Sequence, residues 1–321
     1  MIRKWRTWIW SFLLLIWTTV IAVSLIVLFT AYYGLLLAFV LLLLAETIVF
    51  TVLWFKSEKA SLPKENTSGE REAPLDAIRI NTSLAIAEKI QRQLLPRNLP
   101  EIPGLDVYVK SRPSDEIGGD FYQILSLPNA TLFAIGDVAG HGLPSGMVSI
   151  MLDTLLHAFG PDLRPKDVLT EMNRILYRRI DPSLFSTLLL LYWDHENQRL
   201  MFSSAGHGYL LHYDNGKNML NARKSGGIAL GMIPDISAHV REEEMSFLPG
   251  DALVVCTDGI IEMRNSHGES LGAEKFHHIV TQHAPLDSAQ KVFDNVSQDI
   301  LSFAGTAKQI DDLTLMVLKR I

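Results

Sequence analysis

Residues 120–138, DFYQILSLPNATLFAIGDV, decide the fold class because they are typical of two strands joined by a tight turn. Aromatic and β-branched residues recur in both halves, and Pro128-Asn129 supplies the turn chemistry between them. Asp120 stands where the first strand starts, and Asp137 stands where the second one ends. The stretch therefore predicts a β-hairpin with a carboxylate at both of its open strand ends.

Outward from this hairpin, residues 97–321 alternate between strand-like and helix-like patterns. Helical periodicity predicts helices over 144–159, 165–180, 272–283 and 286–303. Short apolar runs predict strands over 105–111, 185–193, 199–205, 208–213, 238–247, 251–257 and 313–321. Because so many strands follow one another directly, a doubly wound parallel sheet is disfavoured. We expect an α/β layered domain with largely antiparallel sheets.

The N-terminal region has a different composition. Residues 8–30 carry no charge and residues 34–55 carry only Glu46, so each run is long enough to cross a hydrocarbon core of about 30 Å. The first run is longer than the apolar part of a signal peptide. Lys and Arg residues flank the pair on both sides, which places both ends in the cytoplasm. We expect residues 1–56 to form a transmembrane helical hairpin in the cell membrane, with the remaining domain cytoplasmic.

Two segments join this hairpin to the domain. Residues 57–74 are polar and rich in helix breakers, so they predict a flexible linker. Residues 75–96 predict a helix with an apolar stripe that includes Leu84, Ala87 and Leu94, ended by Pro96. That helix would either pair with its copy in a homodimer or pack on its own domain. The sequence favours neither alternative.

Charge and cysteine content exclude several classes of protein. The net charge of −6 offers no basic face for nucleic acid. The single Cys256 fits a reducing compartment and excludes an internal disulfide framework. It lies inside an apolar strand pattern, which argues against a thiol nucleophile. The sequence has no Walker loop, no dinucleotide fingerprint and no zinc-protease motif.

The repeated feature of the domain is an aspartate at the end of an apolar strand. It occurs at Asp120, Asp137, Asp258 and the pair Asp311-Asp312. A carboxylate there is costly unless it is hydrogen-bonded, paired or bound to a cation, and no Lys or Arg accompanies these positions. Oxygen-only ligands select hard ions such as Mg²⁺ or Mn²⁺. Two such ions bridged by carboxylates make a hydrolytic centre that activates a water.

Five motifs in order give this pattern a specific meaning: IGGDFY (117–122), GDVAGHG (136–142), SSAGHG (203–208), LPGDALVVCTDGIIEMRN (248–265) and DDLTLMVL (311–318). From about residue 88 onward the chain resembles the PPM-type metal-dependent protein phosphatases. It is most similar to the bacterial branch that includes stage II sporulation protein E and the sigma-factor regulatory phosphatases. The resemblance implies an α-β-β-α sandwich with two Mn²⁺ or Mg²⁺ ions, which hydrolyses phosphoserine and phosphothreonine in proteins through a metal-activated water.

The resemblance also implies which residues form the site. The metal ligands would be Asp120, Asp137, Asp258, Asp311 (or Asp312, if the register shifts by one residue) and the backbone carbonyl of Val138. Gly119 and Glu262 would support these ligands, and His141 is a candidate general acid. Members of this branch commonly act on a small phosphoserine protein, often an anti-sigma-factor antagonist, under the control of a helical linker.

Two positions depart from the family pattern. Gln123 stands where the family usually has Asp, and Gly208 stands where it usually has Asn. Neither is an inferred metal ligand, so an active enzyme remains the main hypothesis. The alternatives are an inactive membrane-tethered signalling adaptor with the same fold, and a two-metal hydrolase of nucleotides or small phosphoesters.

Overall fold

The computed structural model describes residues 69–96, 99–159, 163–181 and 183–321, with side chains from Thr82 onward. Within these ranges no helix combines the length and hydropathy needed to span a membrane. The transmembrane hairpin expected over residues 1–56 lies outside the described residues. Helix α2 (Gly69–Leu94) is the first described element, and it begins inside the segment expected to be a linker.

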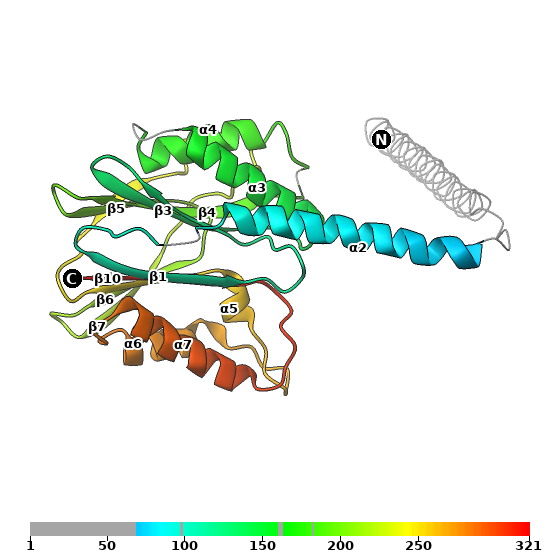
Figure 1. Ribbon diagram of the computed structural model, residues 1–321. Coiled ribbons are helices and arrows are strands. Elements are labelled where there is room, and N and C mark those ends of the chain that lie inside the picture. Colours follow the sequence, from blue (N-terminus) through cyan, green and yellow to red (C-terminus); the bar gives the residue numbers. More distant parts are fainter. Residues whose placement is uncertain (1–68, 97–98, 160–162, 182) are drawn as a thin grey trace, which may run out of the picture. The chain divides into compact units, whose positions relative to one another are not determined.

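The domain contains two five-stranded sheets in which neighbouring strands pair antiparallel (Figure 1). One sheet has the order β2-β3-β4-β5-β8, from β2 (Phe121–Ser126), β3 (Ala130–Val138), β4 (Ser186–Asp194), β5 (Arg199–Ala205) and β8 (Glu242–Met245). The other has the order β1-β10-β9-β6-β7, from β1 (Leu105–Arg112), β10 (Leu313–Arg320), β9 (Ala252–Cys256), β6 (Tyr209–Asp214) and β7 (Met219–Lys224). Each sheet mixes strands from distant parts of the chain.

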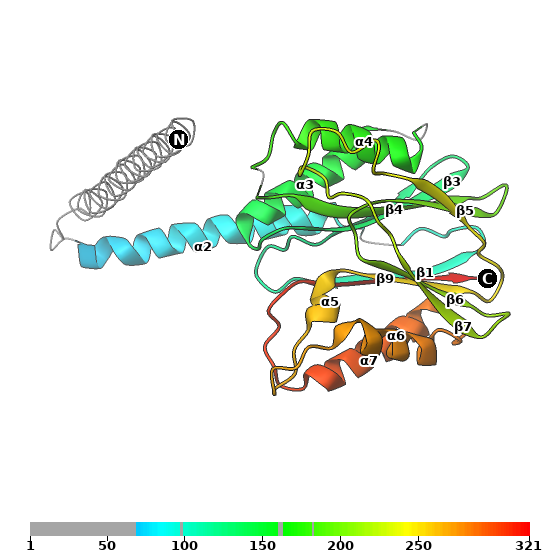
Figure 2. The same cartoon turned by 180° about the vertical axis from the view of Figure 1, so that it is seen from behind.

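Helices cover the outer face of each sheet (Figures 1 and 2). Helices α3 (Leu143–Ala158) and α4 (Pro165–Leu176) pack on the β3-containing sheet. Helices α6 (Gly272–His283) and α7 (Ala289–Ala304) pack on the β10-containing sheet. A short helix, α5 (Asp258–Glu262), directly follows β9. The predicted α-β-β-α sandwich is therefore confirmed.

Three apolar layers hold the sandwich together: one between the sheets and one beneath each helical layer. Phe133, Trp193 and Met316 are fully buried between the sheets. All five residues of β9 are buried, because helices cover one face of that strand and the other sheet covers the other face. Burial on both faces explains why β9 is a continuous apolar run rather than an alternating one.

The strand and helix predictions hold for most of the domain, including the hairpin of β2 and β3 around Pro128-Asn129. The prediction over 238–247 was too long, because β8 pairs with β5 over only four residues. The helix predicted from residue 286 starts at Ala289, where the Ser288 side chain accepts a bond from the Lys291 amide and caps it. Strand β7 was missed, since it is a mostly exposed edge strand without an alternating pattern. Helix α5 was missed as well.

Candidate metal centre

Strand pairing gathers the predicted aspartates at one end of the sandwich. Phe121 pairs with Gly136, so Asp120 and Asp137 lie side by side at the open end of their hairpin. In the other sheet, Cys256 pairs with Leu315. Asp258 therefore follows β9, and Asp311 precedes β10, at the same sheet end. The two sheets together supply one acidic cluster, which we define as Asp120, Asp137, Asp258 and Asp311.

The carboxylates of this cluster repel one another. Burial, together with the charges of Asp258 and Asp311, raises the pKa of Asp137 to about 8. Burial and the Asp137 charge raise the pKa of Asp120 well above its usual value. Partial desolvation also raises the pKa of both Asp258 and Asp311. In the described part of the chain no Lys or Arg forms an ion pair with the cluster, so its negative charge is uncompensated.

Asp120 also joins the two sheets through hydrogen bonds. Its Oδ2 accepts a hydrogen bond from the Thr257 hydroxyl at 2.9 Å and another from the Thr314 hydroxyl. These threonines lie at the ends of β9 and β10, so the carboxylate ties the hairpin of one sheet to the strands of the other. Only its second oxygen is left to face an ion. Neither threonine was predicted to belong to the site, although both lie inside quoted motifs.

The structure also distinguishes the two aspartates before β10. Asp312 is buried, and its Oδ1 accepts hydrogen bonds from the Ser114 amide at 2.7 Å and the Ser114 hydroxyl at 3.1 Å. Its Oδ2 accepts from the Asp120 amide at 3.2 Å. Asp311 is half-buried, and among the described residues its carboxylate accepts only from the neighbouring Asp312 amide, at 2.8 Å. The geometry therefore favours Asp311 as the ligand and gives Asp312 a role in closing the loop.

Glycines bring the backbone close to this cluster. A Cβ at Gly119 would lie 2.8 Å from the Val138 carbonyl oxygen and 3.2 Å from Asp137 Oδ1. A Cβ at Gly259 would lie 2.0 Å from the backbone oxygen of Asp312. Contacts below 3.0 Å force the backbone apart, so neither position accepts a larger residue without rearrangement. Gly119 thus leaves free the space in front of Val138 and Asp137.

These residues fit hard divalent cations. Across the described residues, no three His, Cys, Asp or Glu side chains are gathered tightly enough to enclose an ion as they stand. The donors are nonetheless all oxygens, they carry uncompensated charge, and the Gly119 backbone leaves room beside them. A cation would offset the burial and the mutual repulsion that together raise the pKa values of these carboxylates, and it would draw them together.

The other candidate residues lie around the cluster. The His141 side chain is 83% exposed, and its Nδ1 is 3.3 Å from Asp115 Oδ2. It lies close enough to Asp311 to act on that residue electrostatically, so it stands at the rim of the site. Glu262 is exposed and its charge acts on Asp258. His207 is buried next to Thr187, and burial lowers its pKa to about 4, so it stays neutral at pH 7.

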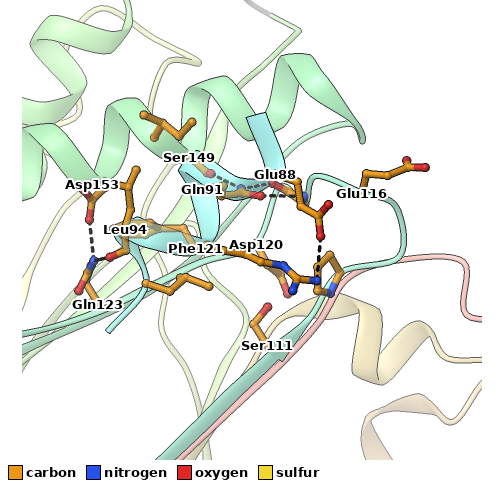
Figure 3. A pocket seen from close by; sticks show the side chains of 15 residues that line it. Glu88, Gln91, Leu94, Ser111, Glu116, Asp120, Phe121, Gln123, Ser149 and Asp153 are labelled. Carbon is orange, nitrogen blue, oxygen red and sulfur yellow. Dashed lines mark hydrogen bonds and ion pairs between the residues drawn. The ribbon is translucent and has the colours of Figure 1, made fainter. Parts of the chain in front are cut away.

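Helix α2 contacts the loop that carries Asp120 through Gln91, which sequence analysis did not single out (Figure 3). The Gln91 amide nitrogen donates to the Gly118 carbonyl at 2.7 Å and to the Ser149 hydroxyl at 2.8 Å. Its oxygen accepts from the Gly118 amide at 3.2 Å. Both backbone groups of Gly118, two residues before Asp120, are therefore bound to one side chain. The residue lies in IQRQLLP (90–96), at the start of the family resemblance.

Neither departure from the family pattern lies in the acidic cluster. The Gln123 amide donates to the Leu94 carbonyl and to Asp153 Oδ1, each at 2.6 Å, so it also fastens the end of α2 (Figure 3). Gln123 and Asp153 line a cavity of about 300 Å³ between α2, α3 and the hairpin of β2 and β3. Asp120 also borders this cavity. A Cβ at Gly208 would meet nothing within 4 Å.

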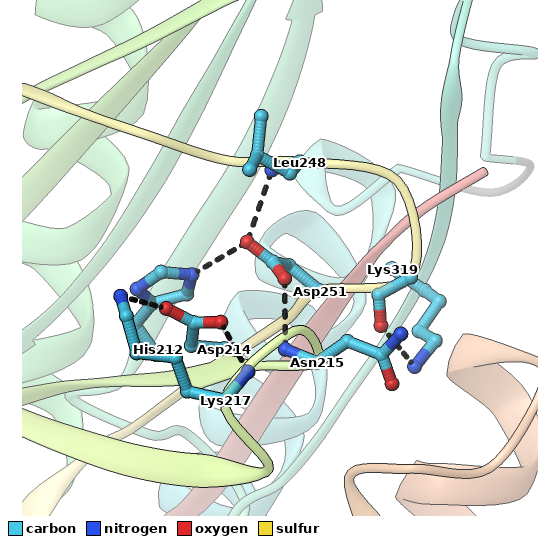
Figure 4. Close-up of polar contacts among 8 residues, drawn as sticks. His212, Asp214, Asn215, Lys217, Leu248, Asp251 and Lys319 are labelled. Atoms are coloured by element: carbon cyan, nitrogen blue, oxygen red, sulfur yellow. Dashed lines mark hydrogen bonds and ion pairs between the residues drawn. The ribbon is translucent and has the colours of Figure 1, made fainter.

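Asp251 shows what a structural aspartate looks like in this fold (Figure 4). It is buried, and its carboxylate pairs with His212 Nε2 at 2.9 Å. It also accepts from the backbone amides of Asn215 at 2.9 Å and Leu248 at 3.0 Å. Protein donors thus compensate the negative charge of the Asp251 carboxylate, whereas that of Asp137 is not compensated in the described part of the chain. This difference separates an aspartate that holds a loop from one that requires a cation.

A sandwich of two sheets with an acidic cluster at one end is characteristic of the metal-dependent serine/threonine protein phosphatases of the PP2C type, and the comparisons with known proteins place the chain in this class. Residues 128–321 match the stage II sporulation protein E (SpoIIE) family, and the chain belongs to that family.

Among curated relatives, the phosphoserine phosphatase RsbU of Bacillus subtilis is 26% identical over 242 residues, which cover 75% of this chain and 71% of RsbU. Protein IcfG of Synechocystis is 24% identical over 263 residues, or 72% of this chain and 40% of IcfG.

Solved structures agree on the fold. The SiaA-PP2C domain of Pseudomonas aeruginosa superposes with a TM-score of 0.66 at 23% identity, covering 80% of this chain and 100% of that domain. The phosphatase domain of SpoIIE from Bacillus subtilis, solved with a fragment of its regulatory domain, gives 0.54 at 20% identity, covering 68% of this chain and 63% of that one. RsbX in complex with magnesium gives 0.52 at 14% identity, covering 70% of this chain and 99% of RsbX.

Proposed function

We propose that this chain is a membrane-anchored phosphatase that hydrolyses phosphoserine and phosphothreonine in a partner protein, within a regulatory pathway such as sigma-factor control. The observation that carries the proposal is the uncompensated acidic cluster at the junction of the two sheets. The relative named phosphoserine phosphatase RsbU supports the choice of a phosphoserine substrate. By analogy with the family, an anti-sigma-factor antagonist is the expected partner.

In this proposal Asp120, Asp137, Asp258, Asp311 and the Val138 carbonyl would hold two Mn²⁺ or Mg²⁺ ions. When bound, such ions lower the pKa of a water and hold phosphoryl oxygens as charge develops. The chain's own residues keep the ligands in place. Thr257 and Thr314 orient Asp120, and Asp312 closes the loop over Ser114.

His141 is the candidate donor of a proton to the departing serine oxygen. It stands at the rim of the cluster beside Asp115 and is 83% exposed, so it could approach a bound phosphoprotein. Because the buried His207 is neutral and bonded to Thr187, it does not suit this role.

The proposal includes anchoring and control. The apolar runs over 8–30 and 34–55 would fix the chain in the cell membrane, with its N-terminus and phosphatase domain in the cytoplasm. Helix α2 would carry a signal to the site through Gln91. Ile86 and Ile90 are 57% and 47% exposed on α2, which supports pairing of this helix in a homodimer.

The adaptor hypothesis receives no support from Gln123 and Gly208, since both lie outside the acidic cluster. The remaining alternative, a hydrolase of small phosphoesters, is separated from the main proposal by substrate comparison. A protein phosphatase should hydrolyse a phosphoserine peptide with a higher kcat/KM than a nucleotide.

The test measures phosphate released from a phosphoserine peptide by the full chain with Mn²⁺, before and after EDTA. We expect activity that EDTA abolishes and that falls at least about 100-fold in Asp137→Asn and Asp258→Asn. Asp235→Asn, a surface aspartate that accepts from the Ser237 amide, is the matched control and should keep full activity. Undiminished turnover in both cluster variants would refute the proposal.

A further inference from the structure

We propose that an apolar groove beside the acidic cluster docks an acidic, amphipathic segment of the phosphoprotein substrate. This inference rests on the proposed function. The groove has a volume of about 250 Å³ and lies between α5, α7 and the strands β1 and β10. Its lining includes Lys110, Arg112, Ile260, Ile300, Leu301 and Leu313.

The groove starts next to the site. Ile260 is two residues beyond Asp258, and Leu313 is two residues beyond Asp311. From there the groove continues along α7 toward Phe293. An extended segment advances about 3.3 Å per residue. A substrate whose phosphoserine reaches the acidic cluster would therefore enter the groove within a few residues.

The groove has the composition of a protein-binding surface. Leu301, which lines the groove, is 51% exposed. Ile300 and Leu313 add apolar surface to the same hollow. Exposed apolar side chains around a concave surface mark interaction sites, because their burial by a partner is favourable.

Charge indicates which partner fits. Lys110 and Arg112 are both exposed in β1, and among the described residues neither forms an ion pair. The Lys110 amine lies 5.2 Å from the Tyr108 ring centroid and 6.0 Å from that of Phe293, so it is held above the aromatic end of the groove. The chain as a whole carries a net charge of −6, which makes these cations locally distinctive. A segment that combines leucines with carboxylates complements this surface.

The test uses the full chain with Mn²⁺ and four probes. These are p-nitrophenyl phosphate, a short phosphoserine peptide, and two longer versions of that peptide, one with a Leu-Glu-Glu-Leu segment on the N-terminal side and one with it on the C-terminal side. A matched extension of Ser and Lys serves as the peptide control. The variants are Leu301→Asp, Lys110→Glu and Arg112→Glu. The protein controls are Met219→Asp and Lys224→Glu, an exposed apolar residue and an exposed cation on β7, at the opposite edge of the same sheet.

We expect one of the two Leu-Glu extensions to lower KM about tenfold in the unmodified chain, with kcat changed less than twofold. Each groove variant should abolish that gain while its activity on p-nitrophenyl phosphate stays unchanged, and both β7 controls should keep the gain. If the short peptide and p-nitrophenyl phosphate are hydrolysed but neither extension lowers KM, or if the groove variants keep the gain, this inference is wrong and the proposed function stands. If no probe is hydrolysed, the proposed function fails and the inference fails with it.

Discussion

At the scale of single residues, the fold uses aspartates in two ways. Asp251 and Asp312 are surrounded by protein donors and hold loops in place. Asp137 lies among other carboxylates, and its pKa is raised to about 8. Both kinds look alike in the sequence, as an Asp next to a Gly or a strand. Only the hydrogen-bond partners, supplied by distant segments, tell them apart.

The first prediction concerns Gly119→Ala. The added methyl would lie 2.8 Å from the Val138 carbonyl oxygen and 3.2 Å from Asp137 Oδ1, so it should displace two of the proposed ligand groups. We expect at least a tenfold weaker affinity for Mn²⁺ in titration calorimetry. Gly208→Ala, where the methyl meets nothing within 4 Å, is the matched control and should bind as the unmodified chain does. Equal affinity in both variants would contradict the assignment of Gly119.

The second prediction concerns the pH dependence of stability without metal. The folded-state pKa of Asp137, about 8, lies above its ordinary value of 3.8, so the folded state holds a proton that the unfolded state releases between these values. The free energy of unfolding should therefore decrease as pH rises from about 5 to 8. Asp137→Asn should flatten this decrease, and urea denaturation across the pH range measures it. A slope identical to that of the unmodified chain would show that Asp137 does not carry the effect.

The third prediction concerns Asp251→Ala. The change removes the acceptor for His212 and for the backbone amides of Asn215 and Leu248, all at a buried position. Leaving such donors unpaired should lower the free energy of unfolding by about 3 kcal/mol. Urea denaturation measures the loss, with Asp235→Ala as the surface control. A change below about 1 kcal/mol would mean that water replaces the lost carboxylate.

At the scale of elements, local patterns predicted those strands whose residues face two apolar layers or lie in a tight hairpin. The Pro128-Asn129 turn fixed the pairing of β2 with β3, and a buried run of five residues identified β9. The edge strand β7 carries no such signal, because it pairs only with β6 and is mostly exposed. The end of α2 was predicted from its periodicity, but its attachment through Gln91 depends on Gly118, 27 residues away.

The fourth prediction concerns the hydrogen bonds between Gln91 of α2 and the backbone of Gly118. Gln91→Ala should free both backbone groups of Gly118 and loosen the loop that carries Asp120. We expect Mn²⁺ affinity to fall about tenfold, as is typical when a group that orients a ligand is removed. Calorimetry measures the affinity, and hydrogen exchange at Gly118 should rise in parallel. Gln93→Ala, at an exposed position of the same helix, should leave both quantities unchanged.

At the scale of the whole molecule, the order of motifs identified the sandwich and the end where its site lies. Each sheet contributes two of the four aspartates of the cluster, so the site exists only when both sheets have assembled. The hydrogen bonds that hold Asp312 could not be predicted, since they come from Ser114, 198 residues earlier in the chain. The groove along α7 could not be predicted from the sequence either, because residues of four separate elements, α5, α7, β1 and β10, form it.

Anomalous scattering from crystals grown with Mn²⁺ would show whether the acidic cluster holds divalent ions. We expect two manganese peaks about 3.5–4 Å apart, within ligand distance of Asp137, Asp258 and Asp311. Crystals of Asp137→Asn should lose at least one of the two. A map from well-diffracting crystals with no manganese peak at this end of the sandwich, or with peaks only elsewhere on the surface, would show that the cluster does not bind divalent ions.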